Sequence, residues 1–269
     1  MAAATTTTRR RRRCVAMIRY VAIMVVALPS IGGTARAACV GLPEQGDGVV
    51  AAVDDGRHVR LQDGREIRLA GIEIESSRQA EATAALASLA RARRVGLRGA
   101  EDVPDRYGRQ PAFVVVDDDA TSLQARLLGA GEAMVGLGIA DSDCRAELLA
   151  AEATARMAQR GLWADPTALK NAGNPGDIMA RVGRFTVIEG RILSVRETGG
   201  TIYLNFGRRW TRDFAVTISR RILGSFEAAG ISPKSLENKR IRVRGWVERR
   251  SGPQIRIREV GQIEMPGAR

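Results

Sequence analysis

Residues 48–72 alternate between apolar and polar side chains, and short turns interrupt the alternation. Apolar residues recur at every second position in 49–53, 59–61 and 67–69, and Asp-Gly at 63–64 separates the last two runs. Side chains alternate across a β-strand, and Asp-Gly pairs favour tight turns between paired strands. This pattern therefore predicts a β-meander.

The residues that follow mix helical and extended patterns. Residues 78–94 are rich in alanine and arginine, with Leu86 and Leu89 three positions apart, which is typical of a helix. Further helices are predicted at 122–129 and 143–159, with Asp143 as the N-cap of the second, and strands at 95–98 and 112–116. Trp163 is expected to pack back onto the domain as a core or a lid aromatic. Strands with interleaved helices predict one α+β domain over residues 46–165.

The second half repeats the strand pattern around one helix. Predicted strands cover 185–195, 201–206, 214–218, 239–247 and 254–257, and the predicted helix covers 222–229. This order resembles the OB-fold, a five-stranded barrel that binds oligonucleotides and oligosaccharides. Residues 166–182 contain two prolines and two glycines and predict a linker with one short helical turn at most. The fold class is thus mainly β with helices (α+β): a first domain of strands with packed helices, then a second five-stranded, OB-like barrel over residues 183–266.

The N-terminal segment, residues 1–37, has the pattern of a secretory signal peptide. Arginines fill positions 9–13, an apolar stretch covers 21–28, and Ala-Arg-Ala at 35–37 is a small-x-small cleavage site. Because a bilayer span needs about 20 apolar residues, an uncleaved membrane anchor is the weaker alternative. Translation from Met17 would give a conventional signal of the same kind. We expect a secreted protein, most simply periplasmic, without stable membrane insertion after cleavage.

Charge is distributed unequally over the remaining residues, 38–269. Residues 38–182 carry 17 basic and 22 acidic side chains, whereas residues 183–269 carry 18 basic and 8 acidic ones. The net charges of the two parts are therefore −5 and +10. Concentrated positive charge attracts polyanions, so the second half is predicted to bind nucleic acid or another polyanion.

Two cysteines, Cys39 and Cys144, remain once the signal is removed. In an oxidising compartment a single pair of cysteines favours a disulfide, and we predict one between them. Two free buried thiols are the alternative.

Three short motifs of the first domain resemble the staphylococcal nuclease (thermonuclease) family. They are Asp-Gly-Arg-His at 55–58, Arg-Leu-Ala-Gly-Ile-Glu-Ile-Glu-Ser at 68–76, and Asp-Arg-Tyr-Gly-Arg at 105–109. The family has Asp-Gly-Asp-Thr, Arg-Leu-x-x-Ile/Val-Asp-Thr-Pro-Glu and Asp-Lys/Arg-Tyr-Gly-Arg at these places. The resemblance implies a small five-stranded barrel in which a calcium ion, a general-base glutamate and two arginines hydrolyse a phosphodiester.

The chain departs from this family pattern at the catalytic positions. Arg57 stands where the family has a calcium-ligating aspartate, and Ser76 stands where it has the general base. A fixed positive charge repels a cation, and a serine hydroxyl is a poor proton acceptor. Calcium-dependent catalysis is therefore expected to be degenerate.

Other positions of the family pattern are retained or have substitutes. Arg68 and Arg109 are retained and are expected to clamp a phosphate, with ordinary structural ion pairing as the alternative. The remaining candidates are weak metal ligands at Asp55 and Glu73 and weak substitute bases at Glu75 and His58. The alternative for His58, the only histidine of the chain, is a solvent-exposed turn residue.

Strand alternation in the second domain separates an apolar face from a basic one. Apolar residues at 241, 243 and 247 alternate with arginines and a tryptophan, and the following strand continues the basic face. Arginines along a backbone and aromatic rings that stack on bases are what single-strand binding uses. The predicted nucleic-acid-binding residues are Tyr203, Arg240, Arg242, Arg244, Trp246, Arg256 and Arg258. A solvated face that reflects the arginine-rich composition is the alternative.

These features favour a secreted thermonuclease-like protein that binds single-stranded nucleic acid. Binding would need no cofactor, and calcium would be required only if catalysis survives. One alternative is an active metal-dependent phosphodiesterase that cleaves DNA or RNA. Another is an envelope module that binds a different polyanion. The sequence leaves enzymatic activity and oligomeric state open.

Overall fold

The computed structural model describes residues 1–4, 37–117 and 119–266. The predicted signal peptide falls almost entirely on residues 5–36, outside this part of the chain. Within the described residues, no helix is both long and apolar enough to cross a bilayer. The described residues from 37 to 266 belong to one compact unit that holds both predicted domains.

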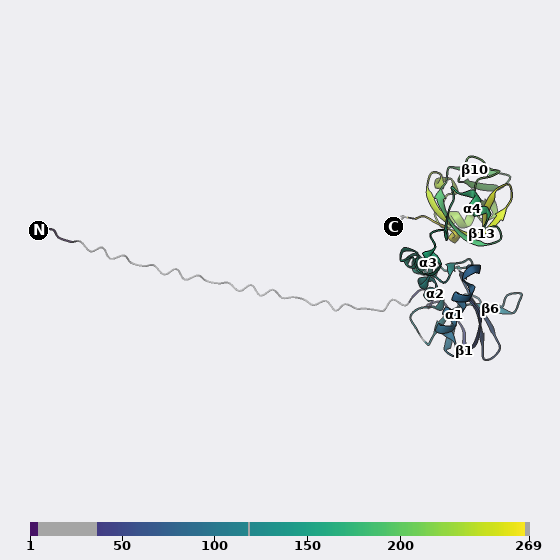
Figure 1. Cartoon of the computed structure of the whole chain (residues 1–269), viewed down its shortest axis with the longest axis horizontal. Coiled ribbons are helices and arrows are strands. Elements are labelled where there is room, and N and C mark those ends of the chain that lie inside the picture. The colour runs from purple at the N-terminus through teal and green to yellow at the C-terminus, as the bar shows by residue number, and fades with distance from the viewer. Residues whose placement is uncertain (5–36, 118, 267–269) are drawn as a thin grey trace. The chain divides into compact units, whose positions relative to one another are not determined.

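A closed five-stranded barrel forms the first domain, as predicted (Figure 1). Its strands are β1 (Glu44–Asp55), β2 (His58–Leu61), β3 (Glu66–Leu69), β5 (Arg94–Arg98) and β6 (Arg109–Val116). They close in the order β1-β2-β3-β6-β5, with β3 and β6 parallel and the other neighbours antiparallel. The alternating residues Val59, Leu61, Ile67 and Leu69 are fully buried, so the apolar face of the meander fills the barrel.

Helices pack against one side of this barrel. They are α1 (Gln79–Ala90), α2 (Leu123–Ala130) and α3 (Ser142–Met157), with 3-10 helices η1 (Ser76–Arg78) and η2 (Gly161–Ala164). The short strands β4 (Ile72–Glu73) and β7 (Met134–Val135) pair beside them. The N-cap of α3 is Asp141 and not Asp143, because the Asp141 carboxylate accepts the backbone N–H groups of Asp143 and Cys144.

Cys39 and Cys144 form a disulfide, which confirms the predicted pair. Both residues are fully buried. The bond joins the segment before β1 to the first turn of α3, 105 residues further along the chain. It therefore fixes α3 against the barrel.

An eight-stranded sheet forms the second domain. The elements are β8 (Leu169–Asn171), α4 (Pro175–Met179), β9 (Phe185–Arg191), β10 (Ser194–Thr198), β11 (Thr201–Asn205), β12 (Ala215–Ser219), η3 (Arg220–Ile222), α5 (Leu223–Ala228), η4 (Pro233–Leu236), β13 (Arg240–Arg249), β14 (Pro253–Ile257), η5 (Val260–Gln262) and β15 (Ile263–Glu264). The strand order is β10-β11-β12-β14-β13-β9-β8, and β15 pairs with β13.

The second sheet repeats the strand order of the first barrel. The predicted strand 185–195 is broken at Ile192 and Leu193, which separate β9 from β10. Counted as two halves of one bent strand, β9 and β10 occupy the place of β1, and the parallel pair β12–β14 occupies that of β3–β6. This is the strand order that the predicted OB-like barrel requires. The sheet encloses its own apolar core, which includes Phe214 and Phe226.

Residues 166–182, predicted as a linker, belong to the second domain. β8 pairs in parallel with β9, and Ile178 of α4 is buried in the core of the second sheet. The prolines and glycines of this segment delimit a short strand and a short helix, the latter starting at Pro175.

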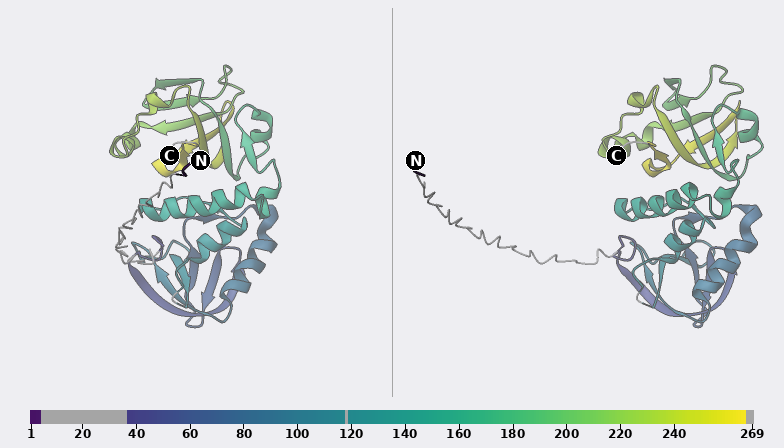
Figure 2. Two further views of the ribbon diagram at one scale, coloured as in Figure 1. Left: turned by 90° about the vertical axis from the view of Figure 1, so that its left-hand side faces the viewer. Right: turned by 60° about the vertical axis from the view of Figure 1, so that its left-hand side comes forward.

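α3 lies between the first barrel and the second sheet (Figure 2). A mixed apolar cluster joins the two domains: Ala155 and Trp163 from the first pack with Phe185 and Val187 of β9. The predicted core packing of Trp163 is thus confirmed, and its neighbours come from both domains.

Candidate functional site

Four strands or loops bring most of the predicted site residues of the first domain together. The β1–β2 turn carries Asp55, Arg57 and His58, and β3 places Arg68 directly opposite His58. The turn lies tightly on α1, because a Cβ added to Gly56 would come within 2.8 Å of Ala82. Glu73 on β4 and the loop that leads into β6 complete the cluster.

Asp55 and Arg109 hold the His58 ring from opposite sides. Asp55 Oδ2 lies 2.7 Å from His58 Nδ1, and Arg109 Nη1 lies 3.1 Å from His58 Nε2. A guanidinium only donates, so Nε2 accepts and the ring proton sits on Nδ1. The side chain of His58 is only 13% exposed, which contradicts the solvent-exposed alternative. The nitrogen lone pair that a general base would use is therefore already engaged.

Burial raises the pKa of Asp55, but hydrogen bonds from His58 and from the backbone N–H of Arg57 outweigh burial. The pKa of this carboxylate consequently lies below its ordinary value. Asp55 is thus an ionised partner of two neighbouring residues.

The loop before β6 fixes the second predicted arginine. Asp105 accepts hydrogen bonds from Nε and Nη2 of Arg109, at 3.1 and 2.9 Å. It also accepts hydrogen bonds from the backbone N–H groups of Tyr107 and Arg109. The hydrogen bond from Arg109 lowers the pKa of Asp105 to about 2. Arg109 also lies over the Tyr107 ring, with its guanidinium carbon 4.8 Å from the ring centre. Arg109 is therefore oriented before any ligand arrives.

Arg68 is the least engaged cation of the cluster. Its side chain is 29% exposed, and its Nε lies 4.0 Å from Asp105 Oδ2. Burial and the positive charge of Arg57 lower the pKa of Arg68. Structural pairing with Glu73 or Asp55, the alternative for this residue, is not observed among the described contacts. Arg68 and Arg109 both approach Asp105, so the two predicted clamp arginines share one site.

Arg57 and Glu73 form an ion pair where the family would hold calcium. Arg57 Nη1 lies 2.5 Å from Glu73 Oε2 and 3.4 Å from the carbonyl oxygen of Ile72. Both predicted metal ligands, Asp55 and Glu73, therefore bind protein donors. Within the described part of the chain, no three His, Cys, Asp or Glu side chains are grouped to hold a metal ion. These residues do not fit calcium, which takes six to eight oxygen ligands.

Glu75, the other predicted base, is directed away from this cluster. Its carboxylate pairs with Arg181, which lies between α4 and β9. Ser76 begins the short helix η1. This ion pair does not favour Glu75 as a substitute base, because its charge is used in a contact between the domains.

Residues 66–165 match the family model of staphylococcal nuclease homologues. This part of the chain is a staphylococcal nuclease-like domain. The match begins at Glu66, after the turn that carries Asp55, Arg57 and His58. No curated protein matches the chain.

Arg244 contradicts the predicted basic outer face of the second domain. It is fully buried, and its guanidinium donates to the carbonyl oxygen of Val135 at 2.8 Å and to both carboxylate oxygens of Glu152 at 2.9 and 3.1 Å. It also binds Glu264 of β15. The outer side of β13 here faces α3 of the nuclease-like domain, so Arg244 cannot contact nucleic acid.

Other residues of that predicted face are partly engaged in the same region. Glu189 of β9 accepts hydrogen bonds from Arg240 and Arg242, and only 12% of the Arg242 side chain is exposed. Trp246 is 45% exposed and packs edge-on against Phe185. Arg242 is thus a structural residue, and Trp246 adjoins the contact between the domains. Arg258 is exposed and stays a candidate.

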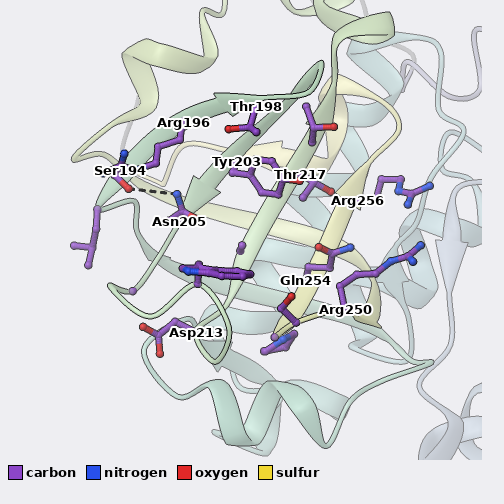
Figure 3. A pocket seen from close by; sticks show the side chains of 18 of the residues that line it. Ser194, Arg196, Thr198, Tyr203, Asn205, Asp213, Thr217, Arg250, Gln254 and Arg256 are labelled. Atoms are coloured by element: carbon purple, nitrogen blue, oxygen red, sulfur yellow. Dashed lines mark hydrogen bonds between the residues drawn. The ribbon is translucent and has the colours of Figure 1, made fainter.

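A groove of about 1310 Å³ lies over β10, β11, β12 and β14 of the second sheet (Figure 3). The strand register places one row of its residues across four neighbouring strands: Arg196, Tyr203, Thr217 and Arg256. Trp210, which is 72% exposed, also lines the groove, as do Arg208, Arg250 and one acid, Asp213. Four arginines against one acid make this surface positive.

Sequence reasoning found two of these groove residues and missed the others. Tyr203 and Arg256 were predicted as binding residues, but Trp210, Arg196 and Arg250 were not. Sequence alternation in strands 201–205 and 215–219 places Tyr203 and Thr217 on the side opposite the apolar Leu204 and Val216, although Thr217 is itself buried. Trp210 and Arg250 lie outside the strands, where alternation gives no signal.

Proposed function

We propose that this protein binds single-stranded nucleic acid through the groove of its second domain and has lost the calcium-dependent cleavage of its family. The groove carries the proposal, because Tyr203, the exposed Trp210 and four arginines line the same surface. Bases stack on such rings while the arginines neutralise phosphates. The nuclease-like domain supports the same ligand class through Arg68 and Arg109.

Loss of cleavage is supported by the bonding state of the candidate catalytic groups. Arg57 forms an ion pair with Glu73, and Glu75 forms one with Arg181. Arg109 donates a hydrogen bond to Nε2 of His58. An active phosphodiesterase needs a cation or an unoccupied base at this place. The active metal-dependent nuclease is therefore the second candidate function, and only the two clamp arginines favour it.

Secretion is part of the same proposal. The signal-like pattern of residues 1–37 and the disulfide between Cys39 and Cys144 both support an oxidising compartment such as the periplasm. N-terminal sequencing of the exported protein should return Ala38 as its first residue.

Binding of a labelled single-stranded oligonucleotide, measured in calcium and in chelator, tests the function. Trp210→Ala should weaken binding by about 1–3 kcal/mol, the usual value of one stacked base. Trp246→Ala is the matched variant on the face that the sequence favoured and should change affinity little. A larger loss of affinity with Trp246→Ala than with Trp210→Ala would show that the binding site lies at β13 and not in the groove.

Salt dependence separates the remaining alternatives. If the four groove arginines each neutralise one phosphate, the slope of log affinity against log salt should be about −3. Equal binding of an anionic polysaccharide would favour the envelope module, and calcium-dependent cleavage removed by Arg109→Ala would establish the nuclease.

A further inference from the structure

We infer that Arg57 takes the place of the family's calcium ion, so that the nuclease-like site holds a nucleic-acid phosphodiester without any metal. The nature of the ligand rests on the proposed function, whereas the independence from metal rests on the contacts of Arg57 itself. Because these residues do not fit calcium, the site is predicted to bind a phosphodiester in the absence of metal.

The first observation is the position of the Arg57 guanidinium. It bridges Glu73, at 2.5 Å, and the carbonyl oxygen of Ile72, at 3.4 Å. Carboxylate and carbonyl oxygens are the groups that bind a hard cation. The backbone N–H of Arg57 also donates to Asp55 at 2.8 Å. The guanidinium and the backbone N–H of Arg57 thus engage oxygens that calcium would need.

The second observation is the charge balance of the cluster. Three arginines (Arg57, Arg68 and Arg109) stand against three carboxylates (Asp55, Glu73 and Asp105), so the site is neutral with no added ion. An aspartate at position 57 would leave two arginines against four carboxylates, a net charge of −2. Such a site would repel a phosphate until a divalent cation bound. The arginine removes that requirement.

The third observation is the unused hydrogen-bonding capacity of Arg68. Within the described residues its guanidinium donates no hydrogen bond, and its closest carboxylate approach is 4.0 Å. A guanidinium offers five donors in a fixed planar arrangement that matches phosphate oxygens. Arg68 is partly buried, and its Nε approaches Asp105, the carboxylate that orients Arg109. A phosphodiester would complete this arrangement.

Dithymidylate, which contains one phosphodiester and is too short to follow the groove, is the probe. We would titrate it into the purified full chain, in calcium and in chelator, and follow its phosphorus resonance. The unaltered protein should bind it equally in both. Arg68→Ala should weaken binding about tenfold or more, as loss of charge-assisted hydrogen bonds does. Arg60→Ala, on an exposed arginine of β2 that pairs with Asp54, is the control and should change nothing.

Arg57→Asp is the decisive variant. It should lose binding in chelator, recover it in calcium, and bind calcium alone in a calorimetric titration. Arg57→Lys keeps the charge with a smaller change in structure and should bind dithymidylate in chelator even if Arg57→Asp does not fold.

Two results would overturn the inference: higher affinity of the unaltered protein in calcium than in chelator, or no binding of dithymidylate in either. Failure of the proposed function is a different result, namely absence of binding by the longer oligonucleotide. Binding of the longer strand without binding of dithymidylate would support the groove as a binding site and refute the metal-free site.

Discussion

Replacement of Arg244 by methionine tests how the two domains are held together. Arg244 lies on β13 of the second domain, and five hydrogen bonds connect it to Val135, Glu152 and Glu264. Glu152 lies on α3 of the nuclease-like domain and is also fully buried. Methionine is unbranched like arginine but shorter and has no donor, so Arg244→Met removes every one of these bonds while it fills the space of the apolar part of the side chain.

The expected loss of stability follows from the charge left behind. Removal of one partner of a buried ion pair costs about 3–5 kcal/mol, because the other charge stays buried without compensation. Glu152 keeps its bonds to Arg156 and to the backbone N–H of Val135, at 2.9 and 2.6 Å. We therefore expect a loss near the lower end, about 3 kcal/mol. That is a large share of the roughly 5–15 kcal/mol that stabilises a typical domain.

Urea denaturation of the disulfide-bonded protein, followed by tryptophan fluorescence, measures this loss. Arg240→Met is the matched control on the same strand: its side chain is 69% exposed and pairs with Glu189, so it should cost less than about 1 kcal/mol. The double variant Arg244→Met with Glu152→Gln removes the uncompensated charge of Glu152. Its loss of unfolding free energy should be smaller than the sum for the two single variants. Equal losses for Arg244→Met and Arg240→Met would refute the reasoning.

Two further predictions concern the same framework. Reduction of the Cys39–Cys144 disulfide, or its replacement by two alanines, should lower the free energy of unfolding by about 2–5 kcal/mol. An unchanged melting temperature with and without a reductant would contradict this. Burial raises the pKa of Glu152, but the charge and hydrogen bonds of Arg244 outweigh it, so its pKa lies below the ordinary 4.5. Its stabilisation is therefore complete above pH 4.5 and is lost as the pH falls through the folded-state pKa. In a pH series of denaturation curves, Glu152→Gln should reduce this loss of stability at low pH. An unchanged loss would exclude Glu152 as its source.

Local patterns were sufficient to predict most of the fold. Val59, Leu61, Ile67 and Leu69 alternate with polar residues and are buried as the pattern requires. A strand that is solvated on one face must keep that alternation, so period-2 patterning is informative there. It could not predict the break at Ile192, because a bent strand keeps its alternation on both sides of the bend.

The candidate site was predictable where a motif fixes a position along the chain. Arg68 and Arg109 occupy one cluster as the motifs imply, and Asp105 holds the loop between them. The pair between Arg57 and Glu73 was not foreseen, because a substituted motif shows which group is lost and not which new contact forms. The groove was missed in part for a similar reason: Trp210 and Arg250 reach it from loops whose path the sequence does not specify.

The contacts of Arg244 change how the charge asymmetry of the chain is understood. A net charge of +10 in residues 183–269 suggests a large external polyanion, yet part of that charge is neutralised within the molecule. Arg244 binds Glu152 of the acidic nuclease-like domain, and Arg242 binds Glu189 and Glu264. Net charge counts these arginines equally with Arg196 and Arg208, which are exposed at the groove. Only exposed arginines release counterions when a nucleic acid binds, so the groove, and not the total charge, sets the electrostatic part of the affinity.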